Sequence, residues 1–216
     1  MSGRSARHLK TNSWLWVKDL PTYGRYDIPI LEPIQIDPSA FSWISFDQAG
    51  KFRNDSKSAV DQGVHFFVYD YNFEATYSEL PRYTDMMQKF GVVCSPDFSM
   101  YSDYPEALNI YNHFRNHAVG AYWQKAGIKV IPTVNWVWES SYDWCFDGMP
   151  KYSTIAVGST TIGKSEFYQQ RFKSGFNEMM KRLKPYCVLW CGEPIEGCEG
   201  PIYYIPSFST KRWRKS

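Results

Sequence analysis

Carboxylate and amide side chains come just after four short apolar runs of this chain. They are Asp47 after residues 41–46, Asp70 after 64–69, Asp97 after 92–94 and Asn135 after 128–134. Two carboxylates in one partly dry site can separate their pKa values, so that one serves as an acid and the other as a base or nucleophile. We therefore predict Asp47, Asp70 and Asp97 as catalytic candidates. The alternative is that each Asp only caps the helix that follows its strand.

Three or more carboxylates at one edge would also offer the oxygen ligands that Mg²⁺ prefers. No other cofactor is indicated. Residues 158–163 lack both the Lys-Ser/Thr ending of a phosphate-binding loop and the glycine spacing of a dinucleotide-binding loop, which argues against ATP or NAD. The four His and five Cys residues show no spacing typical of a zinc site, so we predict no such metal centre.

Five further side chains are candidates for binding a substrate. Asn135, Trp136 and Ser159 follow apolar runs, and Asn112 and Arg115 share one face of a predicted helix. Residues three apart on a helix are neighbours, so Asn112 and Arg115 would form one polar contact with a substrate or partner. A solvated helix face is the alternative explanation for this pair.

The elements that position these residues alternate between strand and helix. Apolar runs begin near residues 41, 64, 92, 128, 154 and 187, and helical periodicity covers 105–127 and 166–183. Such alternation is typical of parallel α/β sheets, which bind ligands at the carboxyl ends of their strands. We predict a single α/β domain over residues 1–216, built as an incomplete or irregular (β/α) barrel with 202–205 as an extra strand. An open doubly wound sheet is the alternative.

Positive charge is concentrated at the two ends of the chain. The basic residues of segments 1–12 and 209–216 are Arg4, Arg7, Lys10, Lys211, Arg212, Arg214 and Lys215. These segments contain no acid, so they carry +7, and the rest of the chain carries −5 of the net +2. Basic segments on an acidic body predict contacts with the phosphates of a nucleic acid. Solubilising ends without a partner are the alternative.

Several features indicate an intracellular protein. No apolar run approaches the roughly 18 residues that a membrane-spanning helix needs. The N-terminus lacks the apolar stretch of a secretory signal. Five cysteines are an odd number in a chain large enough to fold without disulfides, so we expect reduced thiols. We predict no membrane contact.

Four motifs resemble an uncharacterised family of bacteriophages, plasmids and other mobile elements. They are SPDFS at 95–99, GAYWQ at 120–124, GIKVIPTVNW at 127–136 and CFDG at 145–148, within a likeness that covers about residues 27–192. The resemblance implies a mobile-element protein in the cytoplasm of a bacterial host. It implies no established activity.

A second set of motifs is similar to tRNA-guanine transglycosylase-type barrels. The motifs are DQAGKF at 47–52, SPD at 95–97, IPTV at 131–134 and IAVG at 155–158 followed by Gly163 and Lys164. This resemblance implies carboxylates that recognise a purine base and attack its glycosidic bond, with Asp47 and Asp97 as the pair. The zinc-binding Cys/His cluster of those enzymes is missing here, and no Asp follows Gly192 in the place of their nucleophile.

These features predict an enzyme, a transferase or hydrolase, that acts on a nucleotide or nucleic-acid base through acidic residues at strand ends. The alternative is a non-catalytic accessory factor that binds nucleic acid or another protein. In that case the basic ends would hold phosphates, and rings such as Trp136, Trp138 and Trp213 would stack on bases. A converging acidic site favours the enzyme, and an aromatic and basic surface favours the accessory factor.

Overall fold

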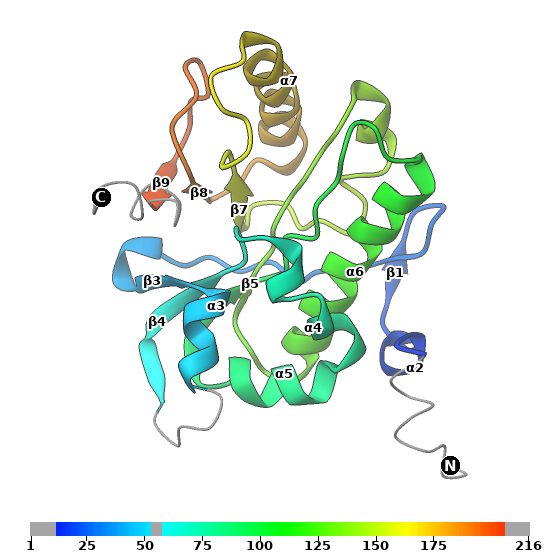
Figure 1. Cartoon of the computed structure of the whole chain (residues 1–216), viewed down its shortest axis with the longest axis vertical. Coiled ribbons are helices and arrows are strands. Elements are labelled where there is room, and N and C mark those ends of the chain that lie inside the picture. The colour runs from blue at the N-terminus through cyan, green and yellow to red at the C-terminus, as the bar shows by residue number, and fades with distance from the viewer. Residues whose placement is uncertain (1–11, 53–57, 206–216) are drawn as a thin grey trace.

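The computed structural model describes residues 12–52 and 58–205 (Figure 1). The basic residues at both ends, and Trp213, lie outside these ranges. The described chain begins with the short helix α2 (Trp14–Val17) and a small antiparallel pair, β1 (Thr22–Tyr23) and β2 (Ile28–Pro29). In this described part, no helix is both long and apolar enough to cross a membrane.

Seven parallel strands follow one another in space in the same order as in the chain. One sheet contains β3 (Ser42–Ser45), β4 (Ala59–His65), β5 (Phe90–Cys94) and β6 (Val130–Ile131), and a second contains β7 (Thr154–Gly158), β8 (Cys187–Cys191) and β9 (Ile202–Ile205). A parallel bridge between Thr133 and Ala156 joins the two sheets. The predicted α/β class with parallel strands is confirmed. The reversal of strand order that defines a doubly wound sheet is absent from the described strands.

Helices fill most of the connections. After η1 (Pro38–Ala40) they are α3 (Phe46–Ala49), η2 (Gly50–Phe52), η3 (Asp70–Asn72), α4 (Ala75–Ser78), α5 (Leu80–Met87), α6 (Glu106–Lys125), η4 (Glu139–Asp143) and α7 (Glu166–Leu183). Figure 1 shows α7 at the top beside β7–β9 and α5 at the bottom below β3–β5. The two long helices match their predicted ranges closely. Pro105 begins α6, and Gly127, with φ of +84°, follows its end.

Several predicted strands have different bounds, and β6 is shorter than the predicted run 128–134. The apolar run 64–69 predicted a strand there, but β4 covers Ala59–His65 and ends where that run is only beginning. The last four residues of β4 pair with β3, and its first residue, Ala59, pairs with Phe90 of β5, so backbone pairing extends the strand back to Ala59. Strand β3 ends at Ser45, and Asp47 therefore lies in α3 and does not follow the strand directly.

Alternate residues of β7 face two different hydrophobic clusters. Ile155 and Val157 pack with Phe176 of α7, whereas Ala156 lies in the cluster that contains Val92 and Val93 of β5. Successive side chains of a strand point to opposite faces, so one face of this sheet is covered by α7. The other face shares its interior with the first sheet. The two sheets therefore share one hydrophobic cluster.

Candidate functional site

Asp97 lies just beyond β5 and is half-buried at the carboxyl ends of the strands. Its Oδ1 accepts a hydrogen bond of 2.7 Å from Nδ2 of Asn135, which lies beyond β6. The pKa of Asp97 is raised to about 7, chiefly by burial. The hydrogen bond from Asn135 opposes this rise, and the charge of Asp70 adds to it. A carboxyl group with this pKa can both donate and accept a proton near neutral pH.

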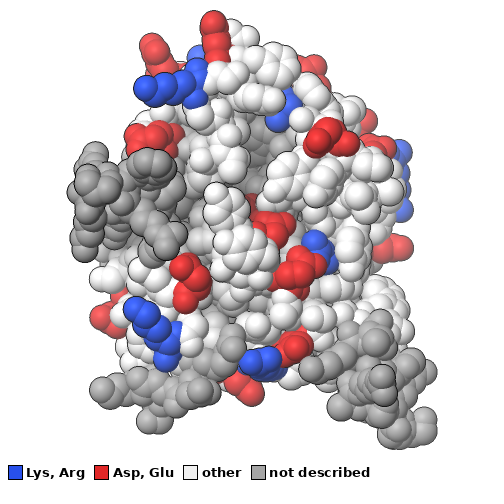
Figure 2. Space-filling model, in the orientation of Figure 1, with Lys and Arg blue, Asp and Glu red and all other residues white. Residues whose placement is uncertain are grey.

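Asp70 joins the loop after β4 to the loop after β5. Its Oδ2 accepts a 3.0 Å hydrogen bond from the backbone N–H of Ser99, and its Oδ1 accepts one of 2.7 Å from the Ser99 hydroxyl. Ser99 lies two residues after Asp97, so these hydrogen bonds join Asp70 to the loop that carries Asp97. The structure thus brings together Asp70, Asp97 and Asn135. Figure 2 shows several acidic side chains gathered near the middle of this face.

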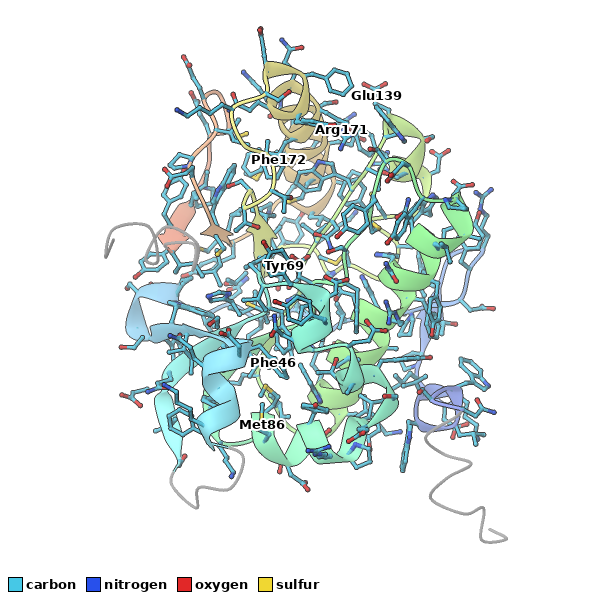
Figure 3. All side chains as sticks on the ribbon, viewed as in Figure 1. Phe46, Tyr69, Met86, Glu139, Arg171 and Phe172 are labelled. Atoms are coloured by element: carbon cyan, nitrogen blue, oxygen red, sulfur yellow. The ribbon has the colours of Figure 1, made fainter. Side chains whose placement is uncertain are left out.

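Asp47 has a different location. It is exposed in the first turn of α3, where Ser45 and Gln48 form a capping box. A carboxylate near a helix N-terminus is favourable because the backbone N–H groups there are partly positive. Figure 3 places its neighbour Phe46 below Tyr69, the neighbour of Asp70. The structure describes no contact of Asp47 with Asp70 or Asp97. The N-cap of α3 is Ser45, so Asp47 lies in the first turn and is not itself the cap.

Arg115 and Asn112 are buried and do not form a solvated helix face. The Arg115 guanidinium is paired with Glu74, and its Nη2 donates a 2.6 Å hydrogen bond to Oδ1 of Asn112. Asn112 in turn donates a 2.5 Å hydrogen bond to the carbonyl oxygen of Ser99. The Arg115 guanidinium also lies 4.0 Å from the ring centroid of Phe98. This network therefore supports the 97–99 loop from the side of α6.

A surface cavity of about 620 Å³ opens beside Arg115. Its walls include Trp14, Tyr71, Tyr77 and Glu74, and Asp97 is not among its lining residues. Glu74 is more than half exposed at this cavity. Arg115 lines this cavity and Asp97 does not. A substrate that contacts Arg115 would therefore lie in this cavity and not beside Asp97.

Ser159 positions the chain after β8. Its hydroxyl oxygen accepts a 2.9 Å hydrogen bond from Trp190 Nε1, and the hydroxyl donates one of 2.7 Å to the carbonyl oxygen of Glu193. Gly192 has φ of +115°, and a Cβ there would lie 2.5 Å from the Ser159 oxygen. The hydroxyl is therefore already engaged within the protein, and Ser159 orients the β8 loop.

Trp136 packs against α7 and is not an open stacking ring. Its ring centroid lies 5.0 Å from that of Phe172, and a Cβ at Gly175 would lie 2.2 Å from its Nε1. The glycine of α7 allows the helix to approach the indole, so Trp136 is only partly exposed, and its contact with a base stays a prediction. Trp138, two residues later, is 43% exposed.

Comparison with known proteins identifies a family for the chain. A family model described as a domain of unknown function, DUF4417, matches residues 20–207. The chain belongs to the DUF4417 family. The predicted likeness to an uncharacterised family of mobile elements is confirmed on the phage side by two relatives, described next.

The relatives of this family member include two mycobacteriophage proteins. The "Gene 1 protein" of Mycobacterium phage L5 is 34% identical over 168 residues, which cover 78% of this chain and 72% of that protein. The "Gene 1 protein" of Mycobacterium phage D29 is 35% identical over 173 residues, which cover 80% of this chain. The match spans 62% of the D29 protein, less than two thirds of its length. No solved structure matches the chain.

The DUF4417 fold also buries two cysteine thiols near the candidate site. Cys94 ends β5 and Cys191 ends β8. Burial raises the pKa of Cys191 to about 12, with a further contribution from Asp97, and burial raises that of Cys94 well above its usual value. Thiols with such pKa values stay protonated at neutral pH and are poor nucleophiles. All five cysteines are free, as expected.

Metal ligands are not gathered at this site. Within residues 12–52 and 58–205, no group of three or more His, Cys, Asp or Glu side chains could hold a metal ion. The acidic residues expected as possible Mg²⁺ ligands therefore do not form a cage in the described structure, because Asp47 is elsewhere and Asp70 bonds Ser99.

A pair of buried histidines was not foreseen from the sequence. His113 and His117 of α6 have ring centroids 4.3 Å apart. His113 Nε2 lies 3.2 Å from the carbonyl oxygen of Asp147, and His117 Nδ1 lies 2.8 Å from that of Pro29. Burial lowers the pKa of His117 to about 4, and burial together with His117 lowers that of His113 well below its usual value. Their spacing of four residues was the available signal.

This pair predicts a loss of stability in acid. The unfolded chain takes up protons at histidine below pH about 6.5, whereas folded His117 does so only near pH 4. The unfolding free energy should therefore fall as pH drops through this window, by on the order of 3 kcal/mol for His117. Urea unfolding at pH 7, 5.5 and 4.5 measures this, and His117→Gln should show a shallower pH dependence. Equal slopes for both chains would contradict the assignment.

Proposed function

We propose that this DUF4417 member breaks or exchanges the glycosidic bond between a nucleobase and its sugar, in a nucleotide or a nucleic acid. The observation that carries this proposal is the carboxyl group of Asp97. It has a pKa of about 7, accepts a hydrogen bond from Asn135 and lies near a second carboxylate, Asp70. Paired carboxyl groups with separated pKa values are the usual means of acid–base work on glycosidic bonds.

An incomplete (β/α) barrel is the fold that we infer for this activity. The seven strands run in chain order, and the interior face of the β7–β9 sheet shares a hydrophobic cluster with β4 and β5. In such barrels the active site lies at the carboxyl ends of the strands, formed by the loops that follow them. Asp70, Asp97 and Asn135 come from three successive loops of this kind.

Each residue then has a chemical role. Protonated Asp97 donates its proton to a ring nitrogen or oxygen of the departing base while the bond from the sugar C1′ to the base breaks and its electron pair leaves with the base. The Asp70 carboxylate stabilises the positive charge that develops on the sugar. Water or an incoming base then bonds to C1′ and returns a proton to Asp97. Asn135 keeps the Asp97 carboxyl oriented.

The structure modifies the pair that the transglycosylase resemblance implied. That resemblance assigned Asp47 and Asp97, but Asp47 lies in the first turn of α3. Asp70 is a better partner for Asp97 because its hydrogen bonds to Ser99 join it to the loop that carries Asp97. The proposal therefore keeps the reaction class and replaces one of its two acids.

Mass spectrometry of reaction products tests the proposal. The chain is incubated with nucleotides and with DNA and RNA oligonucleotides, alone and with labelled free bases, and released or incorporated bases are measured. We expect base release or exchange by the unchanged chain and by Asp85→Asn, an exposed carboxylate on α5, and not by Asp97→Asn. Binding without any base release would favour the accessory-factor alternative and contradict the enzyme.

A further inference from the structure

Exposed aromatic side chains occur on the loops that follow four consecutive strands. We call them the aromatic rim: Tyr69 and Tyr71 after β4, Tyr101 and Tyr104 after β5, Trp138 after β6, and Phe167 and Tyr168 after β7. Each of these side chains is between 42% and 78% exposed. Large exposed rings are unusual when they gather in one place on a protein surface, and such patches commonly bind ligands or partners.

The four loops of the rim are joined to one another. Asp70 bonds Ser99 and so links the loops after β4 and β5. Trp138 donates a 3.1 Å hydrogen bond from Nε1 to the carbonyl oxygen of Ser102, which links the loops after β5 and β6. The Trp138 and Phe167 rings, 6.3 Å apart, link the β6 loop to the start of α7. The rim is therefore one continuous arc, and Asp97 belongs to one of its loops, the loop that follows β5.

Rings of the rim are already packed in pairs. Tyr69 and Tyr71 are stacked, with centroids 5.6 Å apart and planes 13° apart, and Tyr101 lies 4.8 Å from Tyr104. Side chains that are ordered before binding lose less conformational freedom when a ligand stacks on them. The rim thus offers several flat, partly immobilised surfaces of the kind on which planar groups stack.

Arg171 adds a cation to the upper part of the rim. Its guanidinium lies 4.6 Å from the Trp138 ring centroid and 5.2 Å from that of Tyr168. Its Nη1 is buried and makes no hydrogen bond within the described residues. Figure 3 shows Arg171 above Tyr69 in this view. A guanidinium that lies over aromatic rings can also contact a further planar group or an anion.

We propose that the aromatic rim stacks the unpaired bases of a single-stranded nucleic acid and delivers one of them to Asp97. This inference rests on the proposed function for its class of substrate. Stacking on aromatic rings tolerates any base, because every base has a flat face. Duplex bases are enclosed in their stack and are not available to these rings.

Acidic residues near the rim determine which side of a bound nucleic-acid strand faces the rim. Asp103, Glu139 and Glu166 are exposed next to the rim and repel phosphates. The bases therefore face the rim, and the phosphates point outward.

Binding of fluorescent oligonucleotides by the full chain tests this inference. Tyr69→Ala/Tyr71→Ala and Phe167→Ala/Tyr168→Ala remove two separate parts of the rim, and each should weaken binding of a single strand about tenfold or more. Tyr186→Ala is the matched control, an exposed tyrosine at the amino end of β8, and should bind normally. The rim variants should keep the salt dependence of the unchanged chain, because no phosphate contact is lost.

Several outcomes would overturn the inference. They are normal binding by both rim variants, equal binding of an abasic strand of the same length, equal binding of a duplex, or no binding of a single strand by the full chain at low salt. Circular dichroism confirms that each variant is folded, and the use of two separate pairs guards against local unfolding of one loop. Asp97→Asn separates the two proposals, because it should bind normally without releasing bases. Normal base release by Asp97→Asn would refute the role of Asp97 as the acid and leave the rim intact.

Discussion

Replacement of Asp97 by asparagine is expected to lower the rate of base release or exchange by a factor of about 10² to 10⁴, which is the usual contribution of a general acid or base. Asparagine keeps the size of the side chain and an oxygen that can accept the Asn135 hydrogen bond. It cannot donate an acidic proton, so the loss would fall on the chemical step. Product formation under single-turnover conditions measures this loss, with Asp85→Asn as the control for a change of charge.

The same variant should be more stable than the unchanged chain at alkaline pH. The folded Asp97 has a pKa of about 7, above the ordinary value of 3.8, so the folded state holds a proton that the unfolded state releases. The unfolding free energy of the unchanged chain therefore falls as pH rises from about 4 through 7. Asp97→Asn has no carboxyl group to titrate, so it should be more stable than the unchanged chain by on the order of 4 kcal/mol at pH 8 and by little at pH 4. A lower stability at pH 8, together with lost activity, would mean that Asp97 serves packing alone.

Deletion of residues 1–10 and 211–216 is expected to weaken binding of nucleic acid strongly at low salt and to flatten its salt dependence. These segments contain the seven basic residues of the two ends and lie outside the described residues. Each lost phosphate contact removes about 0.9 from the logarithmic salt slope for duplex DNA and about 0.7 for a single strand. Seven lost contacts would thus change the slope for a single strand by up to about 5.

A salt titration from 50 to 200 mM with the full and shortened chains measures this change. The thermal unfolding midpoint should differ little between them, because the deleted segments contain few apolar residues that a core would need. Equal slopes for the two chains would show that the basic ends do not touch phosphates. The charge asymmetry of the sequence would then reflect solubility only.

Much of the fold could be predicted from hydrophobic patterns. The apolar stripe of residues 172, 176, 179 and 183 fixed α7, and Pro105 and Gly127 bounded α6. Strand β4 was misplaced because its first half is polar and is held by pairing with neighbouring strands, which leaves no trace in the pattern of the segment itself. The polar residues Asn112 and Arg115 allowed a solvated face as an alternative for α6. Both are buried, because this helix packs on more than one side.

Topology alone determines part of the arrangement of the candidate residues. Parallel strands in chain order bring the loops that follow them together, so Asn135 bonds Asp97 and Asp70 bonds Ser99 on the same loop. The packing of Trp136 could not be predicted, because only the tertiary structure shows that Gly175 lets α7 approach that indole. The aromatic rim could not be predicted from the sequence for a related reason. Its residues are spread over a hundred positions of the chain, and only the fold gathers them.

The pKa of the Asp97 carboxyl group tests the central claim most directly. The ¹³C chemical shift of this carboxyl, assigned by its disappearance in Asp97→Asn, can be followed from pH 4 to pH 9. We predict a titration midpoint near 7. In Asn135→Ala the midpoint should move upward, because the hydrogen bond from Asn135 lowers the pKa of Asp97. A midpoint near the ordinary value of 3.8 would contradict the account, because Asp97 would then be fully ionised at neutral pH and could not act as the acid.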